Sequence, residues 1–153
     1  MEKLKDLIIN QTSKTPQIEL KYDSGELSLT GKSLPENATR IYDPVLKWVT
    51  DYTQQAQPVT KLRLELEYFN TSSTLWISKI IKALTRIDNP DYRLLVHIYI
   101  PLEEYDEMKD TSDLRDSFSP ITDILQDSIP EVSLKLYATD DASKIIRDAV
   151  VLF

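Results

Sequence analysis

Residues 62–87 read LRLELEYFNTSSTLWISKIIKALTRI, and this stretch decides the fold class. Leucines at positions 62, 64 and 66 alternate with charged residues up to Tyr68, which is the period of a strand with one buried and one solvated face. Four polar residues follow at 70–73. Apolar residues then recur three and four positions apart, which predicts a helix over about residues 72–87. A strand that leads directly into a helix indicates an α/β domain.

The segments on either side extend this pattern. The predicted order is β-β-α-β-α-β-α-β-α. Before the quoted stretch we expect a hairpin over 18–29 that turns at Asp23-Ser24-Gly25, then a short turn at 36–41 and a helix at 43–55 with Pro44 in its first turn. After it we expect a strand at 93–100, a short helix within 101–119, a helix from Ser119 through Leu125 and a strand at 132–137. A final helix is expected from Asp140 or Asp141 through Leu152, with Ile145, Ile146, Ala149 and Val150 on its inner face.

This order predicts the architecture of the sheet. Helices between strands require parallel crossovers, whereas the opening hairpin requires one antiparallel pair, so we expect a mixed five-stranded sheet. Charged residues occupy one face of four of these strands, which favours two layers with helices mainly on one face and the other face open to water. In the strand quoted above, we expect Leu62, Leu64 and Leu66 to face the helices and Arg63, Glu65 and Glu67 to face away.

The composition limits the function classes. The chain has 153 residues with 41% hydrophobic residues, which predicts a single domain over residues 1–153. A net charge of −7 disfavours nucleic acid and anionic membranes as partners.

The apolar run Leu7-Ile8-Ile9 is too short for a signal peptide, so a cytoplasmic location is expected. The chain lacks Cys, has one His and contains no glycine-rich phosphate loop, so we expect no metal and no cofactor.

An enzymatic function has little support in the sequence, and no catalytic residue is predicted. His97 lies inside an apolar strand, where a structural role is the commoner case than membership of a catalytic triad. Acidic pairs occur at 103–104, 106–107 and 140–141, but 25 acidic residues produce such pairs by chance. A hydrolase with an acidic dyad is therefore only a distant alternative.

The polar string Asn70-Thr71-Ser72-Ser73 has two interpretations. These side chains can cap the first turn of the helix. A hydroxyl at a helix N-terminus is also well placed for phosphorylation, because the positive end of the helix dipole tolerates the added charge. The cations that follow most closely, Lys79 and Lys82, lie two turns or more along the helix, so we expect the phosphate to stay at the surface.

A second string, Gly31-x-Ser33-x-Pro35-Glu36-Asn37, lies between the hairpin and the next helix. Its residue types fit the end of a strand, a restricted turn and a helix cap. An exposed loop there is equally consistent with part of a partner-binding surface.

These two strings, in this order and separated by a helix that contains Trp48, resemble the SiaC family of bacterial regulatory phosphoproteins. The Thr15-Pro16 pair before the first strand fits the same resemblance, which is best over residues 15–100. Residues 111–153, with an extra strand and helix, look longer than the family norm.

The resemblance implies a two-layer STAS-like domain that works as a partner-switching module, as anti-sigma-factor antagonists do. It implies phosphorylation at Thr71, with Ser72 and Ser73 as weaker candidates, by a GHKL-like Ser/Thr kinase, and reversal by a PP2C-type phosphatase. It also implies an effector such as a diguanylate cyclase and a role in biofilm regulation. The partner-binding residues that it implies are Gly31, Ser33, Pro35, Glu36, Asn37, Asn70, Thr71, Ser72 and Ser73. The alternative is an unphosphorylated scaffold subunit that docks partners on the open face of the sheet.

Overall fold

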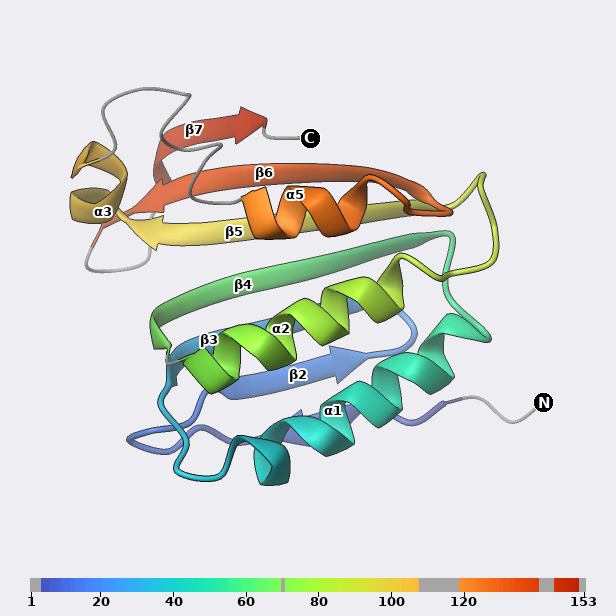
Figure 1. Ribbon diagram of the computed structural model, residues 1–153, viewed down its shortest axis with the longest axis horizontal. Coiled ribbons are helices and arrows are strands. Elements are labelled where there is room, and N and C mark those ends of the chain that lie inside the picture. The colour runs from blue at the N-terminus through green and yellow to red at the C-terminus, as the bar shows by residue number, and fades with distance from the viewer. Residues whose placement is uncertain (1–3, 70, 108–118, 141–144, 152–153) are drawn as a thin grey trace.

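The fold is built on one mixed sheet, shown in Figure 1 for a computed structural model that describes residues 4–69, 71–107, 119–140 and 145–151. Seven strands within these residues follow one another in sequence order across the sheet. They are β1 (Leu7–Ile9), β2 (Gln17–Lys21), β3 (Glu26–Ser33), β4 (Val59–Phe69), β5 (Arg93–Pro101), β6 (Glu131–Thr139) and β7 (Ile145–Val151). The four strands β3 to β6 are parallel to one another, and the pairs β1–β2, β2–β3 and β6–β7 are antiparallel.

The helices form the second layer. Helices α1 (Ala38–Thr53), α2 (Thr71–Leu84) and α5 (Ser119–Leu125) lie over the same face of the sheet, and α3 (Leu102–Glu107) lies beyond the end of β5 (Figure 1). Helix α2 packs against both α1 and α5. The predicted two-layer α/β class, with a mixed sheet and helices mainly on one face, is thereby confirmed.

The alternation in β4 positions the core as expected. Leu62 and Leu64 are buried on the helix side, whereas Arg63 and Glu65 lie on the opposite face. The side chain of Glu65 is only 15% exposed, and its Oε2 accepts a hydrogen bond from Arg63 Nη2 at 2.8 Å. The side chains at positions 66 and 67 lie outside the described part of the structure.

The predicted count of five strands is wrong, because the structure adds one strand at each edge of the sheet. Strand β1 has only three residues, and the apolar run Leu7-Ile8-Ile9 carries no alternation that would indicate it. Strand β7 occupies residues expected to form the final helix. Its sequence IIRDAVV fits one face of a helix, but it is also rich in β-branched residues, which favour a strand. Pairing with the edge of β6 decides in favour of the strand.

Helix α1 begins five residues before its predicted start. Asn37 is its N-cap, with Asn37 Oδ1 accepting a hydrogen bond from the backbone N–H of Arg40 at 3.3 Å. Pro44 therefore lies inside the helix rather than in its first turn. The apolar face of α1 includes Tyr42, Trp48 and Tyr52, which are buried against the sheet. Burying this face stabilises the helix by more than it loses through the backbone hydrogen bond that Pro44 cannot make.

Candidate functional site

The candidate site is the end of the sheet at which the parallel strands finish. In the parallel pair β3–β4, Lys32 lies opposite Tyr68 and Ser33 lies opposite Phe69. The polar string at 70–73 follows Phe69 directly, so the sheet brings the string at 31–37 and the string at 70–73 to one corner. The two strings singled out in the sequence are therefore spatial neighbours.

Thr71 is the first residue of α2, one residue before the start that the sequence predicts. This position is at the positive end of the helix dipole, which favours a negatively charged group. Asn70 and the side chains of Thr71 and Ser72 lie outside the described part of the structure. Position 71 is four residues before Leu75, so the two positions share one side of the helix. Leu75 is 60% exposed, which identifies that side of α2 as the solvent side.

Ser73, in contrast to Thr71, has its hydroxyl in a buried cluster of hydrogen bonds. Its side chain is fully buried, and its hydroxyl donates to the Ser33 carbonyl oxygen at 2.9 Å. The Ser33 hydroxyl donates in turn to Ser73 Oγ at 2.7 Å and shares a short hydrogen bond with the Tyr42 hydroxyl. These contacts tie the first turn of α2 to β3 and α1. A kinase has no access to a hydroxyl in this position, which argues against Ser73 as the phosphoacceptor.

Tyr42 completes this buried polar cluster. Desolvation by burial raises the pKa of Tyr42 above its ordinary value, although its hydrogen bonds with Ser33 and Ser73 act in the opposite direction. The phenol therefore stays protonated at neutral pH and acts as a neutral hydrogen-bonding group. The ring of Tyr42 also stacks on Trp76 of α2, with 6.3 Å between ring centroids and an interplanar angle of 15°.

The string at 31–37 divides into buried and exposed residues. Ser33 and Pro35 are buried, so their roles are structural, whereas Glu36 and Asn37 are exposed. Gly31 has φ +107, and the register of the β3–β4 pair shifts between Gly31 and Lys32. Glycine is favoured at such a positive φ, which explains this residue type. Of the predicted partner-binding residues in this string, Glu36 and Asn37 are the exposed ones, and Lys32 and Leu34 of the same string are exposed as well.

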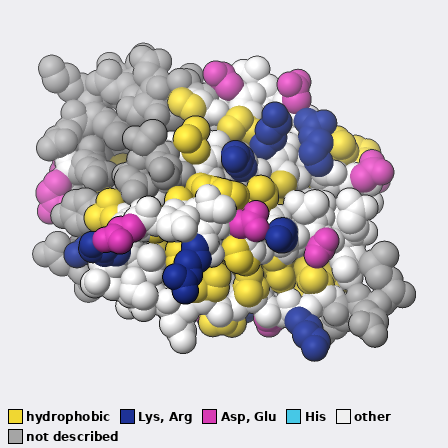
Figure 2. All heavy atoms as spheres, turned by 60° about the horizontal axis from the view of Figure 1, so that its bottom comes forward, with side chains coloured by type: hydrophobic (Ala, Val, Ile, Leu, Met, Phe, Trp, Pro, Cys, Tyr) yellow, Lys and Arg dark blue, Asp and Glu magenta, His cyan; other side chains and the backbone are white. Residues whose placement is uncertain are grey.

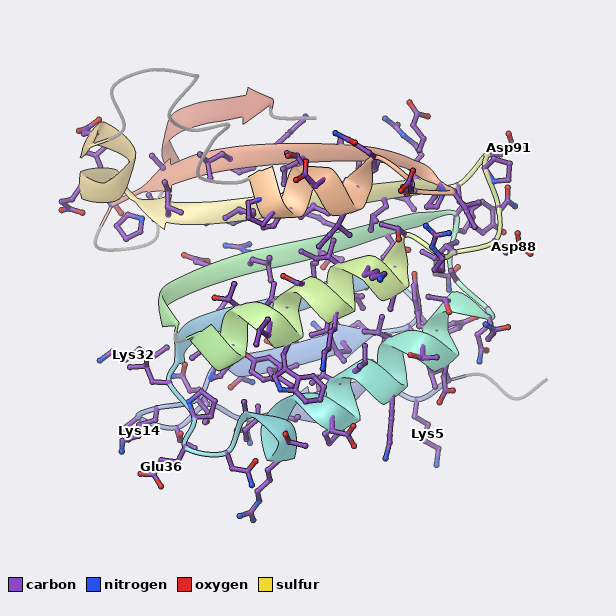
Figure 3. The ribbon with its side chains drawn as sticks, viewed as in Figure 1. Lys5, Lys14, Lys32, Glu36, Asp88 and Asp91 are labelled. Atoms are coloured by element: carbon purple, nitrogen blue, oxygen red, sulfur yellow. The ribbon has the colours of Figure 1, made fainter. Side chains whose placement is uncertain are left out.

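Two lysines lie at the same corner, and sequence reasoning missed them. Figure 3 shows Lys14, Lys32 and Glu36 at the end of the fold where α2 begins. Lys14 Nζ is 3.2 Å from Glu36 Oε1, and the Lys14 carbonyl oxygen accepts a hydrogen bond from the Leu34 N–H at 2.7 Å. Both lysines are exposed. They are 39 to 57 residues before Thr71 in the chain, so only the pairing of β3 with β4 reveals their proximity.

The surface beside the corner carries exposed hydrophobic groups. Seen from the side of α1, hydrophobic side chains gather in the middle of the molecule, with charged side chains around and between them (Figure 2). Leu34 is 38% exposed, and Leu75, which the helical spacing placed among the apolar positions of α2, is 60% exposed. Lys79 Nζ lies 4.6 Å from the centroid of the Trp76 ring. Leu34 and Leu75 thus offer exposed apolar side chains near this corner of the fold.

Two further properties bear on the functional class. In the described residues, no group of three or more His, Cys, Asp or Glu side chains is arranged to hold a metal ion. Among the same described residues, none of the helices combines the length and the hydrophobicity that a membrane span requires.

Comparison with known proteins identifies the family of the chain. The model of the SiaC family regulatory phosphoproteins matches residues 9–127, which is most of the chain. The chain belongs to the SiaC family. An uncharacterized protein of Pseudomonas aeruginosa is 36% identical to it over 81 residues, which are 53% of this chain and 64% of that protein. The chain thus spans less than two thirds of the length of this relative.

Solved structures of SiaC proteins share the fold. Apo-SiaC from Pseudomonas aeruginosa is 25% identical, with a TM-score of 0.62 over 85% of this chain and 98% of that one. SiaC in complex with the diguanylate cyclase SiaD, which it activates, is 23% identical, with a TM-score of 0.66 over 86% of this chain and 100% of that one. At this identity the second likeness shows the fold alone. By its family, this chain is a SiaC family regulatory phosphoprotein.

Proposed function

We propose that this SiaC family protein is a partner switch controlled by phosphorylation of Thr71. A GHKL-like kinase transfers a phosphoryl group from ATP to the Thr71 hydroxyl, and a PP2C-type phosphatase removes it by hydrolysis. The unphosphorylated form binds and activates an effector, for which a diguanylate cyclase is the best candidate because a SiaC of the same fold forms such a complex. The protein itself performs no catalysis and acts in the cytoplasm as one unit.

The observation that carries this proposal is the position of Thr71. It begins α2, shares a helix side with the exposed Leu75, and stands at the corner where the string at 31–37 arrives through β3. A phosphate there receives favourable electrostatics from the helix N-terminus. It also lies on the exposed side of the helix, where it alters what can dock.

The surface around Thr71 explains how the switch works without refolding. A phosphate adds about −1.5 to −2 charges at neutral pH next to an apolar residue, Leu75, that suits contact with a partner. Burying that charge against an apolar partner surface is costly. Lys14 and Lys32 are exposed, so they attract the phosphate without taking it into the interior. The expected coupling of about 1–3 kcal/mol weakens effector binding by roughly 5- to 150-fold.

Intact-mass measurement tests the proposal on protein purified from its native host. Treatment with a PP2C-type phosphatase is expected to remove about 80 Da from part of the population, the mass of one phosphoryl group. Peptide mapping of the untreated sample then places the group on Thr71. An unchanged mass in every growth condition favours the alternative of an unmodified scaffold subunit, and a group on another residue contradicts the site.

A further inference from the structure

The sheet face opposite the helices carries a row of nitrogen-bearing side chains. In the registers of β4 with β5 and β5 with β6, Arg63 lies opposite His97, and His97 lies opposite Lys135. We call these three residues the cationic row. Lys61 lies on the same face, two residues before Arg63. Such a concentration of cations is unexpected in a chain whose net charge is −7.

Tyrosines hold this row in place. Tyr99 and Tyr137 stack with 4.8 Å between ring centroids, and the guanidinium carbon of Arg63 is 4.4 Å from the centroid of the Tyr99 ring. The His97 ring meets Tyr137 edge-on, with centroids 5.4 Å apart. Stacked rings and a cation over a ring limit the rotamers of Arg63 and His97. The row is therefore organised before any ligand arrives.

Two atoms of the cationic row are buried without a hydrogen-bond partner. They are Arg63 Nε and His97 Nδ1. His97 as a residue is more than nine-tenths buried. Arg63 Nε can only donate, and an unsatisfied buried donor costs about 1–3 kcal/mol. The other end of the guanidinium donates to Glu65, and the Arg63 side chain as a whole is 40% exposed, so part of this cation faces solvent.

Acidic side chains lie next to some of the cations on this face of the sheet. Glu65 is paired with Arg63, and Glu26 lies opposite Lys61 in the register of β3 with β4. Desolvation by burial lowers the pKa of His97 below its ordinary value, and the charges of Lys61, Lys135 and Arg63 lower it further. His97 is therefore a neutral imidazole at neutral pH, with the charged side chains of Lys61, Arg63 and Lys135 around it.

We propose that the cationic row binds the carboxylates of an extended acidic segment in a partner protein. Carboxylates can pair with the exposed part of the Arg63 guanidinium and with the half-buried ammonium groups of Lys61 and Lys135. Neighbouring strands are about 4.8 Å apart, so the row spans about 10 Å from β4 to β6, which suits several side chains of a peptide better than one small anion. This inference is independent of phosphorylation at Thr71.

The single histidine of the chain gives a direct probe of this site. The NMR signals of the His97 ring are followed at low ionic strength during titration with N-acetylated hexaglutamate. The ring signals are expected to move, and the pKa of His97 to rise, because a bound carboxylate stabilises the imidazolium form. The matched peptide hexaglutamine is expected to leave both unchanged. No movement with hexaglutamate, or equal movement with hexaglutamine, contradicts the proposal.

A pair of lysine variants locates the effect. Lys135→Gln is expected to weaken the hexaglutamate response roughly fivefold, as loss of one charge contact implies. Lys47→Gln is the matched control, because Lys47 is an exposed lysine on α1 that is paired with Asp43 on the helix side of the molecule. Equal weakening by both variants indicates unspecific attraction and overturns the site. Inorganic phosphate that binds as tightly as the peptide overturns the peptide as the occupant.

Discussion

Replacing Thr71 by alanine is expected to abolish phosphorylation by the cognate kinase while leaving the fold intact. Thr71 is the first residue of α2, on the solvent side of the helix that Leu75 defines. The neighbouring Ser73 cannot substitute for it, since its hydroxyl is buried in hydrogen bonds with Ser33. Incorporation of phosphate, measured by intact mass after incubation with kinase and ATP, is expected to fall from about one group per chain to none.

Two serine variants serve as controls for this result. Ser72→Ala changes the hydroxyl next in sequence, and Ser78→Ala changes one further along α2, whose Oγ donates to the Thr74 carbonyl oxygen at 3.0 Å. Both variants are expected to be labelled as fully as the wild type. Full labelling of Thr71→Ala, or loss of labelling in Ser72→Ala alone, would show that the phosphoacceptor is assigned to the wrong residue.

Replacing Tyr42 by alanine is expected to give the largest loss of stability among changes near the site. Tyr42 is fully buried, stacks on Trp76 and shares a hydrogen bond with Ser33, so truncation opens a cavity between α1 and α2. Aromatic-to-alanine changes in a core cost about 3–5 kcal/mol. For a domain of this size, that lowers the melting temperature by roughly 6–20 °C. Thermal and urea unfolding measure the change.

Tyr42→Phe separates packing from hydrogen bonding in the same position. It keeps the ring but removes the hydroxyl, so a loss of about 1 kcal/mol is expected. If Tyr42→Phe is as damaging as Tyr42→Ala, the hydroxyl cluster rather than the ring stabilises this corner. If Tyr42→Ala unfolds at the temperature of the wild type, the packing described here is wrong.

The centre of the fold was predictable from sequence because its elements have strong periods. The alternation from Leu62 to Tyr68 and the helical spacing that follows it correspond to β4 and α2, and the Asp23-Ser24-Gly25 turn corresponds to the β2–β3 hairpin. The edges were not predictable. Three residues of β1 carry too little pattern, and residues 145–151 satisfy both a helical face and a β-branched strand until pairing with β6 is known.

The candidate site was predictable in part. Each string could be located by its residue types, and the parallel β3–β4 register brings them to one corner. Sequence distance concealed the other components. Lys14 and Lys32 reach the corner only through the sheet, and the exposure of Leu75 depends on where α1 and α5 cover α2. The cationic row likewise exists only because three strands lie in one register.

The most direct test of the switch compares the affinity of two forms of the wild-type protein for its effector. Protein phosphorylated to completion by its kinase and protein treated with the phosphatase are titrated by calorimetry into a diguanylate cyclase from the same host. The account predicts that the unphosphorylated form binds and that the phosphorylated form binds roughly 5- to 150-fold more weakly. Equal affinity of the two forms, or tighter binding of the phosphorylated one, contradicts the claim that phosphorylation at Thr71 releases the partner.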